Sequence, residues 1–229
     1  MSNKWKNRLP IRLDDSQFLE RSDYIISNAI KGRGSFEEIS EIFKQGYPIE
    51  KLSLLFESDN HDVLYVAIET CYEIGKLAKC FVNNVAEIMN KVPSLKTSEG
   101  IVWLADYAEE INSLADWMIV SFIEEENIND VIVALRVLSG ISFGQLRGAK
   151  VFLLEHIPDS SHIDVIGFYL DNYQNENMIF EMMGNNNILM QRYAIAMASR
   201  YLTTNMNIRE EALKIGDAVI HQFVCEKLQ

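Results

Sequence analysis

Residues 52–75 read LSLLFESDNHDVLYVAIETCYEIG, and the spacing of apolar residues in this stretch decides the fold. The second half repeats apolar residues three and four positions apart, which places them on one face of an α-helix. These residues are Val63, Leu64, Ala67, Ile68, Cys71 and Ile74. Asp59 precedes the apolar run, and Gly75 is typical of a residue that ends a helix. The stretch therefore predicts a short helix, a polar turn and a longer helix from His61 to Ile74.

Helix start and stop signals recur along the whole chain, and strand signals are nearly absent. Ser35 and Glu38 have the spacing of a capping box, and Gly46 follows as a stop. Only residues 9–13 alternate apolar and polar, and the proline among them favours an extended arm over a paired strand. Longer helices are expected at residues 76–90, 113–125 and 208–228, among others. The chain is therefore predicted to be all-α, with about 11–12 helices joined by short turns.

The pattern of residues 52–75 returns twice, more loosely. Residues 118–134 read MIVSFIEEENINDVIVA, and residues 178–194 read MIFEMMGNNNILMQRYA. Both segments resemble HEAT-type repeats, with an apolar first helix, a polar turn and small residues in the second helix. Arg192, before Tyr193 and Ala194, resembles the arginine that precedes a small residue in those repeats. The resemblance covers residues 48–205 and implies an α-solenoid of stacked antiparallel helical hairpins.

Charge divides the chain into two expected regions. Residues 1–14 are expected to form a basic extended N-terminal arm, because the first twelve residues carry four basic side chains and no acid. Residues 15–229 are expected to form a single α-helical repeat domain. The net charge is −12, so the remainder after the first twelve residues carries −16.

The acidic balance and the cysteine usage limit the possible partners and the compartment. Nucleic acids and anionic membranes both favour basic surfaces, so neither is an expected partner. The N-terminus, Met-Ser-Asn-Lys-Trp-Lys, lacks the apolar run of a signal peptide, and three cysteines are an odd number with no CxxC spacing. A cytoplasmic location with reduced thiols is therefore expected.

The acidic residues are concentrated between Lys96 and Arg136. This interval contains nine carboxylates and no lysine or arginine, interleaved with Trp103, Tyr107 and Trp117. Such a stretch costs self-repulsion in the folded state, so it indicates a docking surface for a basic protein partner. Residues 124–126, three consecutive glutamates, are instead expected to form a solvated helix end.

The candidate partner-binding residues combine rings and carboxylates on the polar side of three predicted helices. Aromatic rings supply contact area to cationic side chains, and carboxylates steer and orient them. The residues are Tyr65, Glu69, Tyr72, Glu73, Trp103, Asp106, Tyr107, Glu110, Asp164, Phe168 and Asp171. If these helices are the second members of stacked hairpins, the residues line one concave surface. The alternative is that the rings pack against the next repeat and the acids are only solvated.

The sequence contains no recognisable catalytic or cofactor-binding motif. Two histidines, His156 and His162, flank a turn but lack further ligands at a metal-binding spacing. No phosphate-binding or dinucleotide-binding glycine loop follows a strand. We therefore expect no catalytic residues, no cofactor and no metal.

The function predicted from the sequence is non-enzymatic binding of a basic protein. The sharper version is an immunity protein that neutralises a cationic toxin domain, such as a toxic nuclease domain. One alternative is an enzyme similar to the HEAT-like DNA glycosylases, although these need a groove lined by lysine and arginine. Another is a scaffold or regulatory subunit. The partner's identity and the oligomeric state stay open.

Overall fold

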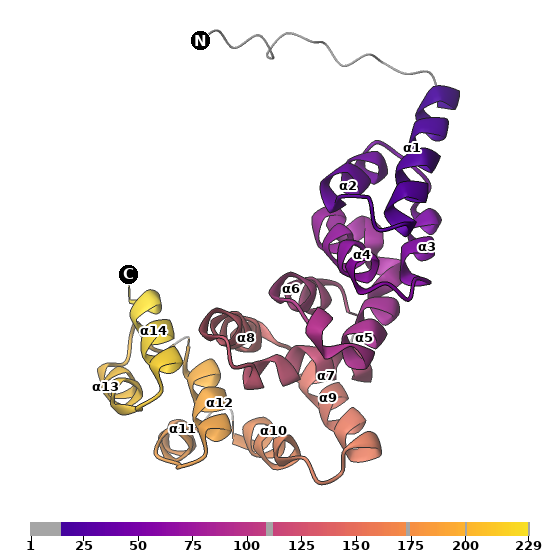
Figure 1. Ribbon diagram of the computed structural model, residues 1–229. Helices are drawn as coiled ribbons and strands as arrows, with labels where there is room; N and C mark the ends of the chain where they lie inside the picture. The colour runs from indigo at the N-terminus through magenta and orange to yellow at the C-terminus, as the bar shows by residue number, and fades with distance from the viewer. Residues whose placement is uncertain (1–14, 109–111, 173–174, 200, 229) are drawn as a thin grey trace, which may run out of the picture. The chain divides into compact units, whose positions relative to one another are not determined.

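The computed structural model describes residues 15–108, 112–172, 175–199 and 201–228. Every regular element among these residues is a helix, so the all-α prediction is confirmed (Figure 1). The chain divides into two compact units, residues 1–74 and residues 75–229, which are taken in turn below. That residues 15–229 form a single repeat domain stays a prediction.

Unit 1 is built from four α-helices and one short 3₁₀-helix. The helices are α1 (Asp15–Ile30), α2 (Phe36–Lys44), η1 (Ile49–Leu52), α3 (Ser53–Phe56) and α4 (His61–Ile74). Helix α2 packs on α4, and α1 contacts α2 and α3. The interior is aliphatic, with Ile39, Leu52, Leu55 and Ile68 fully buried. The predicted helix at residues 61–74 is confirmed.

Local signals set the ends of the helices in unit 1. The Ser35 hydroxyl accepts a hydrogen bond from the backbone N–H of Glu38 and so caps α2. Gly32 and Gly46 follow α1 and α2 with φ of +73° and +101°, a backbone region that glycine adopts without strain. Directly after Gly46, the Tyr47 hydroxyl donates a hydrogen bond to the carboxylate of Asp23 in α1 at 2.5 Å. This bond ties the end of α2 back to α1.

Unit 2 continues with shorter helices. These are η2 (Gly75–Phe81), α5 (Val82–Lys91), η3 (Pro93–Leu95), α6 (Ser98–Tyr107), α7 (Ser113–Ser121), η4 (Phe122–Glu124), α8 (Ile128–Gly140), α9 (Phe143–His156), α10 (Ser161–Asn172), α11 (Glu176–Met183), α12 (Ile188–Ala198), α13 (Met206–Lys214) and α14 (Ala218–Lys227). Helix α7 contacts α5, α6, α8 and α9 (Figure 1). All of its residues from Ala115 to Ser121 are buried, so α7 is the central helix of this unit.

Helix α8 is the second organising element of unit 2, because it contacts α12 and α14 from distant parts of the chain. Arg136 of α8 pairs with Glu226 of α14 at 2.6 Å. Arg192 of α12 donates to the backbone carbonyl of Ile123 at 2.5 Å and pairs with Asp217 at 3.3 Å. These contacts join α14 to α8 and α12 to η4 and the start of α14.

Two predicted helices are wrong in their extent. The expected helix at residues 76–90 begins as the 3₁₀-helix η2 and becomes α-helical only at Val82. The expected helix at residues 208–228 is two helices, α13 and α14. Asp217 causes this break, because its carboxylate accepts from the backbone N–H groups of Val219 and Ile220 and starts a new helix there.

No single helix in the described ranges is long and apolar enough to cross a membrane. The pair α8 and α9 has sufficient combined length and composition, but the two helices are bent by 117° where they meet. Both helices bury residues inside unit 2, among them Leu135 and Leu146.

The crossing of α7 and α9 depends on a glycine. A Cβ atom at Gly148 of α9 would lie 1.9 Å from Oδ2 and 2.9 Å from Cγ of Asp116 on α7. Both distances are far below van der Waals contact, and both residues are buried. The absence of a side chain at Gly148 therefore allows the two helices to approach this closely.

We expect Gly148→Ala to destabilise the protein by about 1–3 kcal/mol, because overpacking outweighs the gain in helix propensity of about 1 kcal/mol. Urea unfolding measures this loss. Gly140→Ala is the matched control, since a Cβ there meets nothing within 4 Å. The loss should shrink in an Asp116→Ala background, with a coupling of about 0.5–3 kcal/mol. Equal losses in both backgrounds would contradict the assigned contact.

Candidate functional site

The partner-binding residues predicted in unit 1 all lie on α4, and three of the four are exposed. Tyr65 and Tyr72 are 41% and 43% exposed and lie two turns apart on the same face. Glu73 is exposed and pairs with Lys44 of α2 at 3.1 Å. Glu69 is buried, with 6% of its surface exposed, so its predicted exposure is wrong. The physical reason is that α4 is buried continuously from Ala67 to Cys71, a wider arc than one apolar stripe.

In unit 2 the predicted exposure of Trp103 is also wrong. Its side chain is 1% exposed, and its indole N–H donates to the backbone carbonyl of Gly75 at 3.2 Å. The Tyr107 ring packs against the indole at 5.8 Å and is itself half-buried. The alternative reading, in which rings pack against neighbouring elements, holds for this pair.

The other predicted residues of unit 2 differ in exposure. Asp106, Asp164 and Asp171 are exposed, and Phe168 is half-buried. Glu110 lies outside the described residues. That the whole set lines one concave surface stays a prediction, and Glu69 and Trp103 no longer belong to it as surface residues.

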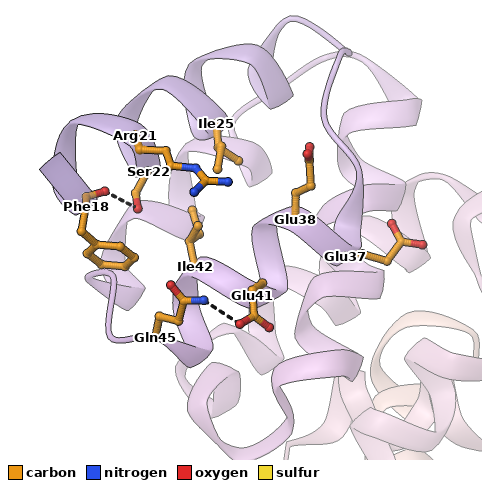
Figure 2. A pocket seen from close by; sticks show the side chains of 9 residues that line it. All are labelled: Phe18, Arg21, Ser22, Ile25, Glu37, Glu38, Glu41, Ile42 and Gln45. Atoms are coloured by element: carbon orange, nitrogen blue, oxygen red, sulfur yellow. Dashed lines mark hydrogen bonds between the residues drawn. The ribbon is translucent and has the colours of Figure 1, made fainter. Parts of the chain in front are cut away.

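The structure adds a site that the sequence analysis did not identify, a groove between α1 and α2 in unit 1 (Figure 2). Its volume is about 390 Å³. It is lined by Phe18, Arg21, Ser22, Ile25, Glu37, Glu38, Glu41, Ile42 and Gln45. We call it the α1–α2 groove.

Helical spacing explains why these residues meet. From α1, the lining residues are Phe18, Arg21, Ser22 and Ile25, which are three, four and seven positions apart and therefore share a face. Ser22 is fully buried, and its hydroxyl donates to the carbonyl of Phe18 at 2.8 Å. Because the Ser22 side chain is small, it leaves space at the bottom of the groove. Phe18, Ile25 and Ile42 make this floor of the groove mainly apolar. Figure 2 shows Arg21 reaching from α1 toward the residues of α2.

The rim of the α1–α2 groove is acidic. Among the described residues, Arg21, Glu37 and Glu38 take part in no ion pair, and Glu41 accepts only an amide hydrogen bond from Gln45 at 2.6 Å. Three carboxylates against one guanidinium give the groove a formal charge of −2. Residues 15–74 as a whole hold five basic and twelve acidic residues, a net charge of −7.

Helix capping explains part of this acidic rim. Glu37 and Glu38 occupy the first turn of α2, where carboxylates interact favourably with the helix dipole. Glu41 lies a turn further on, outside the range of this effect. The spacing of the three acids on one predicted helix was visible in the sequence. Their meeting with the Phe18 face of α1 depends on tertiary packing, which periodicity does not reveal.

A second pocket, of about 280 Å³, lies in unit 2. It is lined by Met89, Asn90, Pro93, Lys96, Trp117, Met118, Ser121, Glu124 and Glu125. Lys96 pairs with Glu125 at 3.0 Å and lies 5.6 Å from the centre of the Phe122 ring. Glu124 lies 3.1 Å from Nε2 of His162. The three glutamates lie at the end of η4, with Glu124 and Glu126 exposed and Glu125 half-buried, and two of them also pair with residues distant in sequence.

His162 links three elements behind this second pocket. Its Nδ1 lies 3.2 Å from the Tyr193 hydroxyl of α12, and its ring meets the Trp117 indole edge-on at 5.1 Å. Burial lowers the pKa of His162, and the neighbouring Glu124 opposes that shift only in part. A neutral His162 thus joins α10 to η4 and α12.

The second pocket holds its polar groups in internal contacts. The Ser121 hydroxyl donates to the carbonyl of Met118 at 3.1 Å, and Lys96 is held by Glu125. Within the described ranges, no three His, Cys, Asp or Glu side chains are grouped to hold a metal ion. The α1–α2 groove is different, since its charged groups face outward without ion-pair partners among the described residues. It is the better candidate for binding.

No protein-family model and no curated protein matches the sequence. The candidate site therefore stands on its own geometry.

Asp116 is the most strongly perturbed carboxyl group of unit 2. It is fully buried in α7, and neither carboxyl oxygen has a hydrogen-bond partner among the described residues. Burial raises the pKa of Asp116 to about 8. Asp116 faces Gly148 and lines neither the α1–α2 groove nor the second pocket, so its ionisation is expected to affect the stability of the fold.

We expect Asp116 to make the protein less stable as the pH rises. The folded state keeps the proton of Asp116 up to about pH 8, whereas the unfolded state loses it near the ordinary aspartate pKa of 3.8. Between these values the free energy of unfolding falls by about 1.4 kcal/mol per pH unit from this group. Asp116→Asn should remove that slope in urea unfolding at pH 4.5–7.5. The exposed Asp171→Asn controls for the lost charge, and equal slopes in wild type and Asp116→Asn would contradict the assignment.

Proposed function

We propose that this chain is a non-enzymatic protein-binding module that holds a basic protein through the acidic surface of unit 1. The observation that supports this most directly is the α1–α2 groove. It combines an apolar floor with three rim carboxylates, and Glu37 and Glu38 have no ion-pair partner among the described residues. Such a groove suits a segment that carries apolar and cationic side chains together.

The charge of the groove argues for a cationic protein segment over other ligand classes. A nucleic acid or an anionic metabolite would bring phosphate against three carboxylates and only one guanidinium. The HEAT-like DNA glycosylase alternative needs a basic groove, which the net charge of −7 over residues 15–74 disfavours. A scaffold or regulatory subunit could use the same acidic groove. That alternative predicts several different partners, whereas an immunity protein binds one cationic toxin domain.

Helix α4 offers a second contact area within the same unit. Tyr65 and Tyr72 expose about two fifths of their surfaces, and Asp62 and Glu73 lie on the same helix. Exposed tyrosines beside carboxylates are typical of the anchoring residues of protein interfaces. The partner would then be held by the groove and by tyrosine contacts.

We propose that the helices form a degenerate HEAT-like array of stacked hairpins. Contacts between a helix and the next but one support this in six cases, α2 with α4, α5 with α7, α6 with α8, α7 with α9, α10 with α12 and α11 with α13. Arg192 of α12 bridges the Ile123 carbonyl in η4 and the carboxylate of Asp217 at the start of α14. Within unit 2, the contacts of α8 with α12 and α14 bring together helices that an open array keeps apart, so this part of the proposed array is curled.

The sharper version of the proposal is an immunity protein that captures a cationic toxin domain in the cytoplasm. Capture must be fast to protect the cell, and long-range attraction between opposite charges raises association rates by about 10–10³-fold. The net charge of −12 provides that attraction toward a basic domain. This version also explains why acids outnumber bases far beyond the requirement for solubility.

The test uses a cationic nuclease domain of the toxin class as the partner, and binding is measured by surface plasmon resonance. Glu37→Lys/Glu38→Lys/Glu41→Lys should lower the association rate constant at least tenfold, because it reverses the charge of the groove. The matched control is Glu50→Lys/Glu57→Lys/Asp59→Lys, which makes the same charge change at exposed residues of unit 1 that do not line the groove.

The outcomes of this experiment separate the claims. Equal loss in both triple variants would show that net charge acts and the groove does not. No salt-sensitive binding by the wild-type chain would reject the immunity version. Thermal unfolding of each variant checks that the fold is retained, because all six residues are exposed and unburied charges change stability little.

A further inference from the structure

The sequence just before α1 has the chemistry that the α1–α2 groove lacks. Residues 4–13 read KWKNRLPIRL and contain four basic residues and no acid. Apolar residues are interleaved with these charges, at Trp5, Leu9, Ile11 and Leu13. We call residues 4–13 the basic arm; it lies outside the described residues.

We propose that the basic arm docks in the α1–α2 groove of its own chain, with its cationic side chains on Glu37, Glu38 and Glu41 and its apolar side chains on the floor of the groove. This deepens the proposed function, because it places a competitor for a basic partner at the same site. The role of competitor rests on the proposed function, whereas the docking itself does not.

Charge complementarity is the first argument for this occupant. The groove has a formal charge of −2, and the arm carries +4. Glu37 and Glu38 are exposed and have no ion-pair partner among the described residues, so docking displaces no existing salt bridge from them. The arm is the only part of the sequence in which four basic residues occur within nine positions without an acid.

The shape of the groove matches the alternating character of the arm. Phe18, Ile25 and Ile42 form an apolar floor, and carboxylates stand along the α2 side (Figure 2). An extended segment turns successive side chains to opposite sides, so it can place apolar and basic residues against different walls. Pro10 favours such an extended conformation, since its ring fixes φ near the value of polyproline II.

The connection is long enough for the arm to reach the groove. Phe18 lies in the first turn of α1, which begins at Asp15, and Ile25 marks the far end of the same face. The axial distance from residue 18 to residue 25 is about 10 Å. Ten extended residues span about 33 Å, so the arm can reverse its direction and still cross the groove.

The covalent connection also lowers the affinity that docking requires. A segment tethered by a few residues has an effective concentration on the order of millimolar at its site. Closing a short loop costs little entropy, and that cost grows only slowly with length. Modest ion pairs and partial burial of Leu9 or Ile11 are therefore sufficient. A second copy of the chain would need a much higher affinity at ordinary protein concentrations.

Trp5 provides a direct probe of the docking. The chain has only two other tryptophans, Trp103 and Trp117, and both are buried in unit 2. The indole N–H resonance of Trp5 can be identified in ¹H–¹⁵N spectra of the full chain by its loss in Trp5→Phe. We expect this resonance to lie away from the random-coil position at low salt and to return to it in 0.5 M NaCl.

The groove is tested by Glu37→Gln/Glu38→Gln/Glu41→Gln, which should return the Trp5 resonance to its random-coil position. The matched control, Glu50→Gln/Glu57→Gln/Asp59→Asn, removes the same charge elsewhere in unit 1 and should leave the resonance shifted. If the groove variant fails to fold, Lys4→Gln/Lys6→Gln/Arg8→Gln/Arg12→Gln removes the same attraction without altering any described helix. It should give the same random-coil resonance.

A random-coil Trp5 resonance in the wild-type chain would overturn the proposal, and so would equal effects of the groove and control variants. Dependence of the shift on protein concentration over a tenfold dilution would assign the groove to a second copy instead. A shifted resonance together with no binding of the cationic domain would leave the docking in place and reject the proposed function. The two failures are therefore distinguishable.

Discussion

None of the described helices is longer than the sixteen residues of α1, and most have eight to fourteen, so each depends on the apolar face that it buries against its neighbours. Isolated helices of this length are only marginally stable in water. Helix α7 is the clearest case, with nine residues of which seven consecutive ones are buried. Its buried residues contact α5, α6, α8 and α9. The rest of unit 2 is arranged around this burial, including the close approach of α9 at Gly148.

The same constraint determines where charge can go. A chain with 33 acidic and 21 basic residues must keep nearly all carboxylates on the outer faces of its helices. Glu69 and Asp116 are buried exceptions among the described residues, and burial raises the pKa of Asp116 rather than providing it with a partner. On the surface, some acids find lysine or arginine, as Glu73 and Glu125 do. Glu37 and Glu38 do not among the described residues, and this residual repulsion favours a cationic ligand at the α1–α2 groove.

The sequence predicted those features that depend on local chemistry. The helix at residues 61–74 and the cap at Ser35 follow from residues within one or two turns, and both are confirmed. Features that depend on tertiary contacts were wrong or missed. Periodicity indicated one apolar stripe on α4 but not the wider burial that encloses Glu69. It gave no sign that the Trp103 indole reaches the Gly75 carbonyl. The groove needs two helices to meet, so neither helix alone could reveal it.

The uneven distribution of charge also affects how a partner would bind. If the basic arm occupies the groove, a basic partner exchanges one set of cationic contacts for another and does not neutralise bare carboxylates. Salt weakens both sets, because both are exposed and the Debye length at physiological ionic strength is about 8 Å. The net salt dependence of partner affinity is then smaller than the number of interface ion pairs implies. Long-range steering still acts, since it depends on the total charge of −12, to which the arm contributes whether docked or not. Association rate and final affinity are thereby governed by different parts of the same charge distribution.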